Sequence, residues 1–159
     1  MLAAHRGIGR PVRSPYLLLH GWPESWRLPE KLVRGRQAAY FDYFYDVLSA
    51  DPSRITAESR AAHVSAYESE SALTAGFDLY RAFTQDAADN AAFHEPTSAP
   101  LLYLRGDREG GDIAAYAEGF RRAGVENLKT AVIRDAGHFA QEEQPAQVWA
   151  EIHAFACGP

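Results

Sequence analysis

The C-terminal part of the chain alternates short strand-like runs with amphipathic helices, and this order constrains the fold more than any other feature. The runs at 101–104 and 129–133 are each followed by a turn glycine. A helix that begins after Asp112 separates them, and a last helix opens at Pro145. Strand, helix, strand and helix with short connections form a parallel sheet with right-handed crossovers. The sequence therefore predicts an α/β fold.

The middle of the chain predicts helices and no strand. Apolar residues recur at helical spacing from 32 to 48, a second helix is expected over about 57–67, and a third over about 70–84. Gly35 and Gly76 weaken the helices that they interrupt. We therefore expect a helical insert between two parts of an α/β core.

A further strand is expected before this insert. Tyr16-Leu17-Leu18-Leu19 is a short apolar run that ends at a turn, which is typical of a buried parallel strand. The expected layout is a first core strand and its loop at 1–26, a helical block at 27–97, and a βαβα core at 98–159. The sheet would then be a small parallel one of about three strands.

Composition excludes several classes of protein. The chain has 159 residues and a formal net charge of -5, which makes a nucleic acid an unfavourable partner. A single cysteine, Cys157, cannot form an internal disulfide or a thiolate metal cage. No apolar run approaches the ~20 residues of a membrane span, and residues 1–13 lack the apolar region of a secretory signal. We expect a cytoplasmic protein with no metal and no cofactor.

The chemistry of such a sheet is expected at the carboxyl ends of its strands, where α/β proteins bind ligands. Three segments end at that edge: His20-Gly21-Trp22-Pro23-Glu24, Gly106-Asp107-Arg108-Glu109 and Ala136-Gly137-His138-Phe139. The convergence of the three is a stronger signal than any one of them alone.

An acid–base pair is the first function that these segments predict. His138 follows a strand-ending glycine and is a candidate general base. Glu109 can accept its ring N–H, fix the tautomer and stabilise the imidazolium. Asp107 is the runner-up for this acid, although it is more simply a turn residue, and Asp112 is more simply a helix cap. The spacing of the three acids does not match a calcium-binding EF-hand loop.

The first segment predicts an anion site. His20-Gly21-Trp22-Pro23 can turn the chain sharply and direct the backbone N–H of Trp22 at an oxyanion, with His20 and Gly21 forming the loop. Taken alone, this turn is common.

Together the segments resemble a known family. YLLLHGWPESW, LLYLRGDREGGD and DAGHFAQEEQP are similar to motifs of the α/β-hydrolase fold, in the branch of epoxide hydrolases and haloalkane or fluoroacetate dehalogenases. The resemblance covers about residues 15–157. It implies that His138 is the base, that Glu109 is the acid, and that HGWPES forms the oxyanion hole. It also implies that the helical block is the cap that covers the substrate pocket.

One part of the family pattern is missing. Family members run to nearly twice this length and continue after HGWPESW to a nucleophile elbow, which also supplies an oxyanion donor. Here HGWPESW runs straight into RLPEKL, so an internal deletion is expected near Trp26-Arg27. No glycine is followed two residues later by Ser, Asp or Cys and four residues later by a second glycine. Ser25 is a turn serine rather than a substitute nucleophile.

The cap offers candidates for proton donors without singling one out. Epoxide hydrolases use cap tyrosines, and the tyrosines of this block are Tyr40, Tyr43, Tyr45, Tyr67 and Tyr80. A loose match of ITAESRAAHVSAY to the second cap-tyrosine helix places His63 near that position.

Three interpretations follow for the function. The favoured one is a hydrolase by descent that is catalytically impaired because its nucleophile segment is missing. The second is a hydrolase of altered mechanism, in which His138 and Glu109 act on water. The third is a non-catalytic module that binds a small molecule or interacts with another protein. A small-molecule substrate or ligand is the expected partner, and an exposed strand edge could drive homo-oligomerisation.

Overall fold

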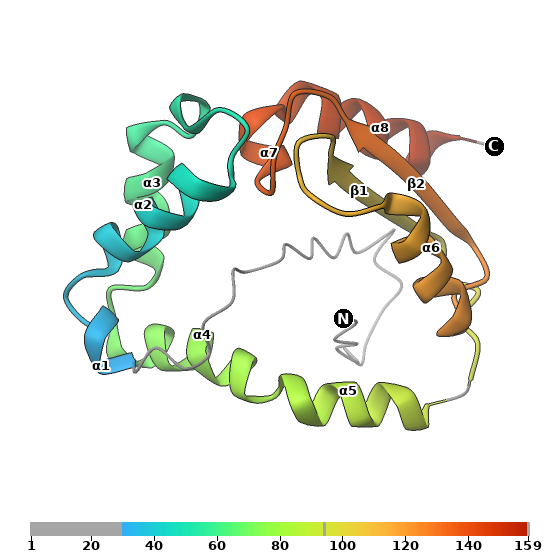
Figure 1. The fold of residues 1–159 in the computed structure, drawn as a ribbon, viewed down its shortest axis with the longest axis horizontal. Helices are drawn as coiled ribbons and strands as arrows, with labels where there is room; N and C mark the ends of the chain where they lie inside the picture. Colours follow the sequence, from blue (N-terminus) through green and yellow to red (C-terminus); the bar gives the residue numbers. More distant parts are fainter. Residues whose placement is uncertain (1–29, 94, 159) are drawn as a thin grey trace.

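The computed structural model describes residues 30–93 and 95–158 (Figure 1). The strand expected at 16–19, Ser25 and the expected oxyanion loop of His20, Gly21 and Trp22 lie outside the described residues. The expected α/β class is confirmed, with helices and a small parallel sheet.

Helices form the whole first half of the described chain. Their bounds are α1 Glu30–Val33, α2 Gln37–Leu48, the 3-10 turn η1 Pro52–Arg54, α3 Ala57–Ala66, α4 Glu70–Arg81 and α5 Phe83–Ala92. We call residues 30–92 the helical block. In Figure 1, α1 to α3 lie on one side of the molecule, and α5 runs back toward the sheet.

The helical block contains more breaks than the sequence predicted. The run from 32 to 48 is two helices, because Gly35 takes a left-handed conformation with φ of 75° that ends α1. The helix expected over 70–84 ends at Arg81, and a separate helix, α5, begins at Phe83 after Ala82. The second helix is confirmed, and Thr56 caps it by accepting from the Ser59 N–H.

The sheet of the described chain has two parallel strands, β1 Leu101–Gly106 and β2 Leu128–Ile133. They pair in register from Leu101 opposite Leu128 to Gly106 opposite Ile133. The helix α6 Ile113–Arg122 crosses between them. Asp112 caps α6, as expected, by accepting from the Ala114 N–H at 2.9 Å.

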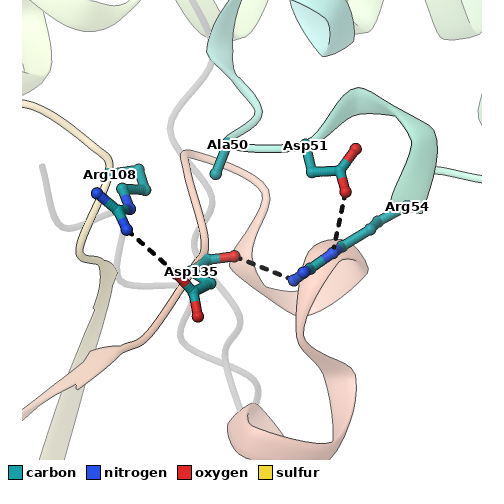
Figure 2. Close-up of a pocket in the computed structure, with 5 residues that line it drawn as sticks. All are labelled: Ala50, Asp51, Arg54, Arg108 and Asp135. Atoms are coloured by element: carbon teal, nitrogen blue, oxygen red, sulfur yellow. Dashed lines mark hydrogen bonds and ion pairs between the residues drawn. The ribbon is translucent and has the colours of Figure 1, made fainter.

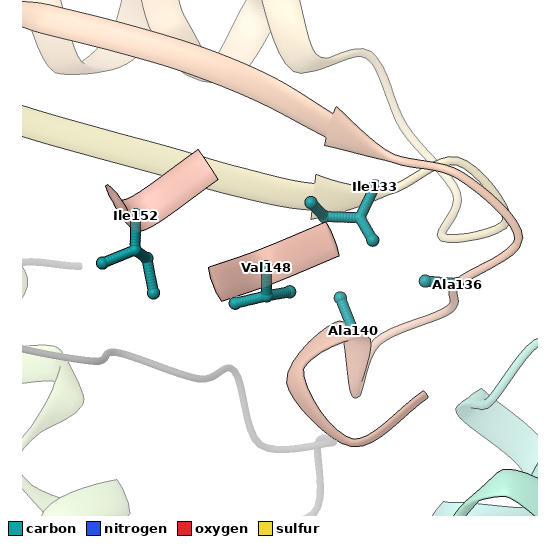
Figure 3. Packing of buried hydrophobic residues seen from close by; sticks show 5 residues of the cluster. All are labelled: Ile133, Ala136, Ala140, Val148 and Ile152. Atoms are coloured by element: carbon teal, nitrogen blue, oxygen red, sulfur yellow. The ribbon is translucent and has the colours of Figure 1, made fainter. Parts of the chain in front are cut away.

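Two helices complete the C-terminal unit. The short α7 Ala140–Glu143 was not predicted, whereas α8 Pro145–Cys157 begins at Pro145 as expected. The inward face of α8 packs on the sheet, and Figure 3 shows this core gathered at the end of β2. Its buried members are Ile133, Ala136, Ala140, Val148 and Ile152. Burying these side chains contributes roughly 1–3 kcal/mol for each of the larger ones.

The helical block has two smaller apolar clusters of its own. One consists of Val33, Leu73 and Phe77, which hold α1 against α4. The other contains Phe41, Tyr45 and Ile55 together with Phe139, which belongs to the C-terminal unit. The Phe139 ring meets Tyr45 edge-on at 4.9 Å. Phe139 therefore links the helical block to the segment that follows β2.

No helix in the described ranges is both long and apolar enough to cross a membrane.

Candidate functional site

The loops that follow β1 and β2 lie side by side because the two strands are parallel neighbours. The Asp107 N–H donates to the Ile133 carbonyl at 2.9 Å, and the Arg108 N–H donates to the Ala136 carbonyl at 2.9 Å. A Cβ at Gly106 would overlap the Ala136 carbonyl, so only glycine allows this close approach. The acid loop (residues 107–111) and the base loop (residues 134–139) are therefore joined at their start.

His138 and Glu109 meet at this edge of the sheet. The Nδ1 atom of His138 lies 2.7 Å from Oε1 of Glu109. The two side chains are 16% and 25% exposed, so the pair is shielded but reachable from solvent. An ionised carboxylate only accepts, so Nδ1 of His138 is the donor in this contact. In a neutral imidazole, this is the tautomer that a general base needs, with Nε2 as the acceptor.

Arg105 is the second-to-last residue of the strand β1, and its side chain faces Glu109. Its side chain is buried, at 8% exposure, and its Nε is 3.8 Å from Oε2 of Glu109. It donates to the Tyr103 hydroxyl at 3.0 Å and to the Gly110 carbonyl, and its guanidinium stacks over the Tyr116 ring at 4.4 Å. Burial lowers the pKa of Arg105, but hydrogen bonds with Tyr103 and Tyr116 outweigh it, so the pKa is raised. A permanent positive charge thus faces the acid.

The base loop is docked on the C-terminal end of α2. The backbone N–H of His138 donates to the Leu48 carbonyl at 2.9 Å. A Cβ at Gly137 would overlap the Leu48 carbonyl and the Ala50 nitrogen, so this contact requires glycine. The backbone that leads into the candidate base is therefore held by an element about 90 residues earlier in the chain.

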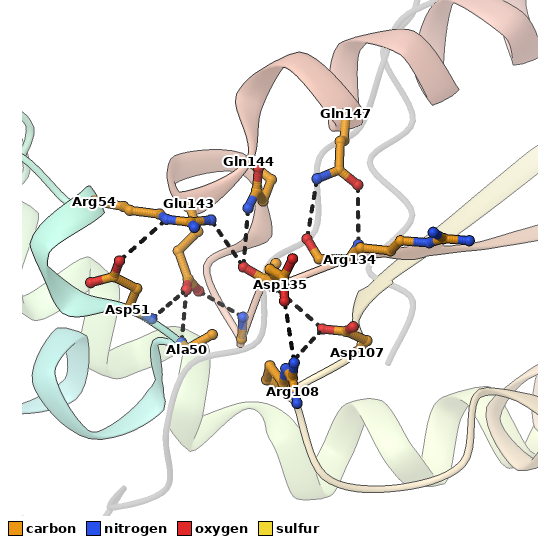
Figure 4. A network of polar contacts seen from close by, with 12 residues as sticks. Ala50, Asp51, Arg54, Asp107, Arg108, Arg134, Asp135, Glu143, Gln144 and Gln147 are labelled. Carbon is orange, nitrogen blue, oxygen red and sulfur yellow. Dashed lines mark hydrogen bonds and ion pairs between the residues drawn. The ribbon is translucent and has the colours of Figure 1, made fainter.

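A buried carboxylate completes this junction. Glu143, 4% exposed, accepts from the backbone N–H groups of Ala50, Asp51 and Gly137 at 2.7, 3.0 and 2.8 Å. Figure 4 shows the carboxylate between the segment after α2 and the base loop. Three donors satisfy a charge that would otherwise be costly to bury.

A second polar group lies between α2, α3 and α7. The Tyr45 hydroxyl is 2.7 Å from Nδ1 of His63, Nε2 of His63 is 3.4 Å from Glu142, and the Ser59 hydroxyl donates to Glu142 at 2.6 Å. Burial, followed by the nearby Glu142 charge, raises the pKa of Tyr45 to about 12. Tyr45 therefore stays protonated while its hydroxyl contacts His63.

An open cavity of about 450 Å³ lies beside the acid and base loops, lined by Ala50, Asp51, Arg54, Arg108 and Asp135 (Figure 2). Its charges pair with one another. Arg108 contacts Asp135 at 3.2 Å, Arg54 contacts Asp51 at 3.3 Å, and Arg54 also donates to the Asp135 carbonyl at 3.2 Å. The charged side chains that line the cavity are therefore neutralised within it.

The remaining candidates occupy structural positions. Asp107 accepts from the Ala136 N–H at 3.4 Å and lies 3.6 Å from Arg108. Cys157 is an exposed free thiol at the end of α8. Among the residues that the structure describes, no three His, Cys, Asp or Glu side chains are grouped so that they could hold a metal ion.

Two residues of this site were missed by sequence reasoning, Arg105 and Glu143. Arg105 lies inside a strand, where its burial beneath the acid loop leaves no periodic signal. Glu143 ends a helix of four residues, which is too short for hydrophobic periodicity to reveal. Its type and position in GHFAQEEQP were visible, but its partners at Ala50 and Asp51 are distant in sequence.

Comparisons with known proteins place the fold. No protein-family model and no curated protein match the sequence. Cfl2 from Burkholderia cenocepacia is 28% identical, with a TM-score of 0.67 over 81% of this chain and 44% of Cfl2. The epoxide hydrolase CorEH, without ligand, is 20% identical, with a TM-score of 0.65 over 79% of this chain and 44% of CorEH. ALR0039 from Nostoc sp PCC 7120, assigned as an alpha/beta hydrolase, is 21% identical, with a TM-score of 0.67 over 87% and 47%.

The fold matches part of the α/β-hydrolase fold. The chain spans less than half the length of each of these three proteins. The similar structures include an epoxide hydrolase, with which this chain shares the fold.

Proposed function

We propose that this chain is a hydrolase of the epoxide hydrolase and dehalogenase type that is catalytically impaired, with His138 as base and Glu109 as the acid that orients it. The observation that supports the proposal is the 2.7 Å contact between His138 Nδ1 and Glu109 at the carboxyl ends of neighbouring parallel strands. The α/β-hydrolase fold of the chain supports it as well.

In such an enzyme a carboxylate attacks the substrate carbon, and the base then activates water to cleave the resulting ester. No nucleophile elbow is present in the sequence, so the first of these steps has no agent. His138, with Nδ1–H donated to Glu109, can still take a proton from water through Nε2. Loss of one member of a catalytic group leaves roughly 10³–10⁴-fold acceleration over water at best. The expected activity is slow, general-base hydrolysis, with the Trp22 N–H as an oxyanion donor.

The experiment compares turnover of styrene oxide, fluoroacetate and p-nitrophenyl acetate by the chain and by its His138→Ala and Glu109→Gln variants. We expect slow turnover of at least one substrate, lost in His138→Ala and reduced in Glu109→Gln. Mass spectrometry should find no covalent adduct. Turnover equal in the chain and in His138→Ala would contradict the proposed base. A fast, stoichiometric adduct at one residue would contradict the missing nucleophile.

The missing elbow also favours a second candidate, a small-molecule-binding module that retains the fold without catalysis. Saturable binding of one of these substrates by calorimetry, with no turnover above His138→Ala, would support this alternative.

A further inference from the structure

We propose that Glu143 is a positioning residue for His138, because its carboxylate fastens the base loop to the end of α2. The inference rests on the proposed function only in naming His138 as a base. The contact geometry itself is independent of activity.

The carboxylate adds hydrogen bonds between two segments that are also joined by the His138 N–H bond to the Leu48 carbonyl and by the Phe139–Tyr45 ring contact. Oε2 takes the N–H groups of Ala50 and Asp51, which follow α2, and Oε1 takes the N–H of Gly137, which precedes the base. Each carboxylate oxygen thus accepts from the N–H groups of one of the two segments. A glutamine side chain in the same place would turn its NH₂ group toward the donors of at least one segment, and the hydrogen bonds with that segment would be lost.

The position of His138 depends on this junction directly. Gly137 is held by Glu143, and the next N–H, that of His138, is held by the Leu48 carbonyl at 2.9 Å. The backbone N–H groups of Gly137 and His138 are therefore both hydrogen-bonded, immediately before the Cα atom that carries the His138 side chain. A 2.7 Å contact with Glu109 tolerates little displacement, and a shift of about 1 Å would break it.

The neighbouring carboxylate provides a matched control. Glu142 lies in the same turn of α7, but its side chain contacts Ser59 and His63 in α3, whereas the Glu143 side chain takes the Gly137 N–H. Glu142→Gln therefore removes a carboxylate of the same helix and the same junction between helical block and core, without releasing Gly137.

The test follows the His138 imidazole N–H by ¹H–¹⁵N NMR, as a far-downfield resonance protected by Glu109. In Glu143→Gln we expect its exchange with water to accelerate by at least about tenfold, while circular dichroism shows a folded chain. Glu142→Gln should keep the wild-type exchange rate. A folded Glu143→Gln variant with wild-type exchange at His138 would overturn the proposal.

A measurement on the wild-type chain covers the case in which Glu143→Gln does not fold. Native-state hydrogen exchange gives an opening free energy for each N–H group. The amides of Ala50, Asp51 and Gly137 should open together with the His138 imidazole N–H, in one event. Opening of the Gly137 amide while His138 stays protected would overturn the proposal. Absence of turnover in the wild type would contradict the proposed function but leave this result unchanged.

Discussion

Arg105 shows how one buried side chain can support an acid that lies outside the strand. Its guanidinium satisfies the Tyr103 hydroxyl and the Gly110 carbonyl and stacks on Tyr116, and it faces Glu109. In Arg105→Met two acceptors lose their donor, so we expect the free energy of unfolding to fall by roughly 2–3 kcal/mol. Urea denaturation followed by circular dichroism measures the change.

Arg108→Met is the control for this prediction, since Arg108 is 62% exposed and pairs with Asp107 and Asp135 at the surface. An exposed ion pair contributes little, so the loss should stay below about 1 kcal/mol. Equal losses in the two variants would show that burial of Arg105 has no energetic consequence.

Tyr45 makes a prediction about pH. Its pKa is about 12 in the folded chain and 10.0 for an unperturbed tyrosine, so the folded state holds this proton more tightly. The stabilisation is complete below pH 10 and is lost as the pH rises toward about 12. Tyr45→Phe should therefore have a shallower decline of unfolding free energy over this range, measured by urea denaturation at several pH values.

The exposed Tyr43 in the same helix gives the matching control for the loss of a hydroxyl. If Tyr45→Phe and Tyr43→Phe change the slope equally, the effect does not come from the buried hydroxyl of Tyr45.

At the scale of elements, the contact between the base loop and α2 depends on the absence of a side chain at Gly137. In Gly137→Ala the new methyl group would overlap the Leu48 carbonyl and the Ala50 nitrogen, so the loop must move away from α2. Such overpacking typically costs about 1–3 kcal/mol, and thermal denaturation should show a lower Tm.

Gly119→Ala tests the opposite case. Gly119 lies inside α6 with no atom within 4 Å of its added Cβ, so alanine should raise stability by about 0.5–1 kcal/mol. If Gly137→Ala were neutral or stabilising, the close contact between the base loop and the end of α2 would be contradicted.

The elements that the sequence predicted are those whose signals are local. The strands predicted at 101–104 and 129–133, which the structure extends to 101–106 and 128–133, the cap at Asp112 and the start at Pro145 each depend on a few adjacent residues. The meeting of His138 and Glu109 followed from one topological rule, that parallel strands end at the same edge.

Other features depended on distant partners and could not be predicted. The split of the first helix at Gly35 required a left-handed φ, which glycine allows but does not impose. The end of α4 at Arg81 has no glycine or proline to mark it. The two bonds of Glu143 with Ala50 and Asp51 depend on packing between segments more than 80 residues apart.

At the scale of the whole molecule, stability is unevenly distributed. In the part of the chain that the structure describes, one apolar cluster lies against the sheet, one joins α2 to Phe139, and one holds α1 against α4. The helix α5, the last helix of the helical block before the sheet, contributes no buried residue to any of these three. A helix of ten residues without a buried face is marginal in water, because its stability must come from packing.

Native-state hydrogen exchange should therefore show a gradient along the chain. We expect the amides of α5 to open at about 0–2 kcal/mol and those of the paired strands β1 and β2 to require the full free energy of unfolding. The helix α4, which buries Leu73 and Phe77, should fall between the two and serves as an internal control of similar length. Protection in α5 equal to that in β2 would contradict this distribution, because it would require α5 to be packed against a part of the molecule that covers one of its faces.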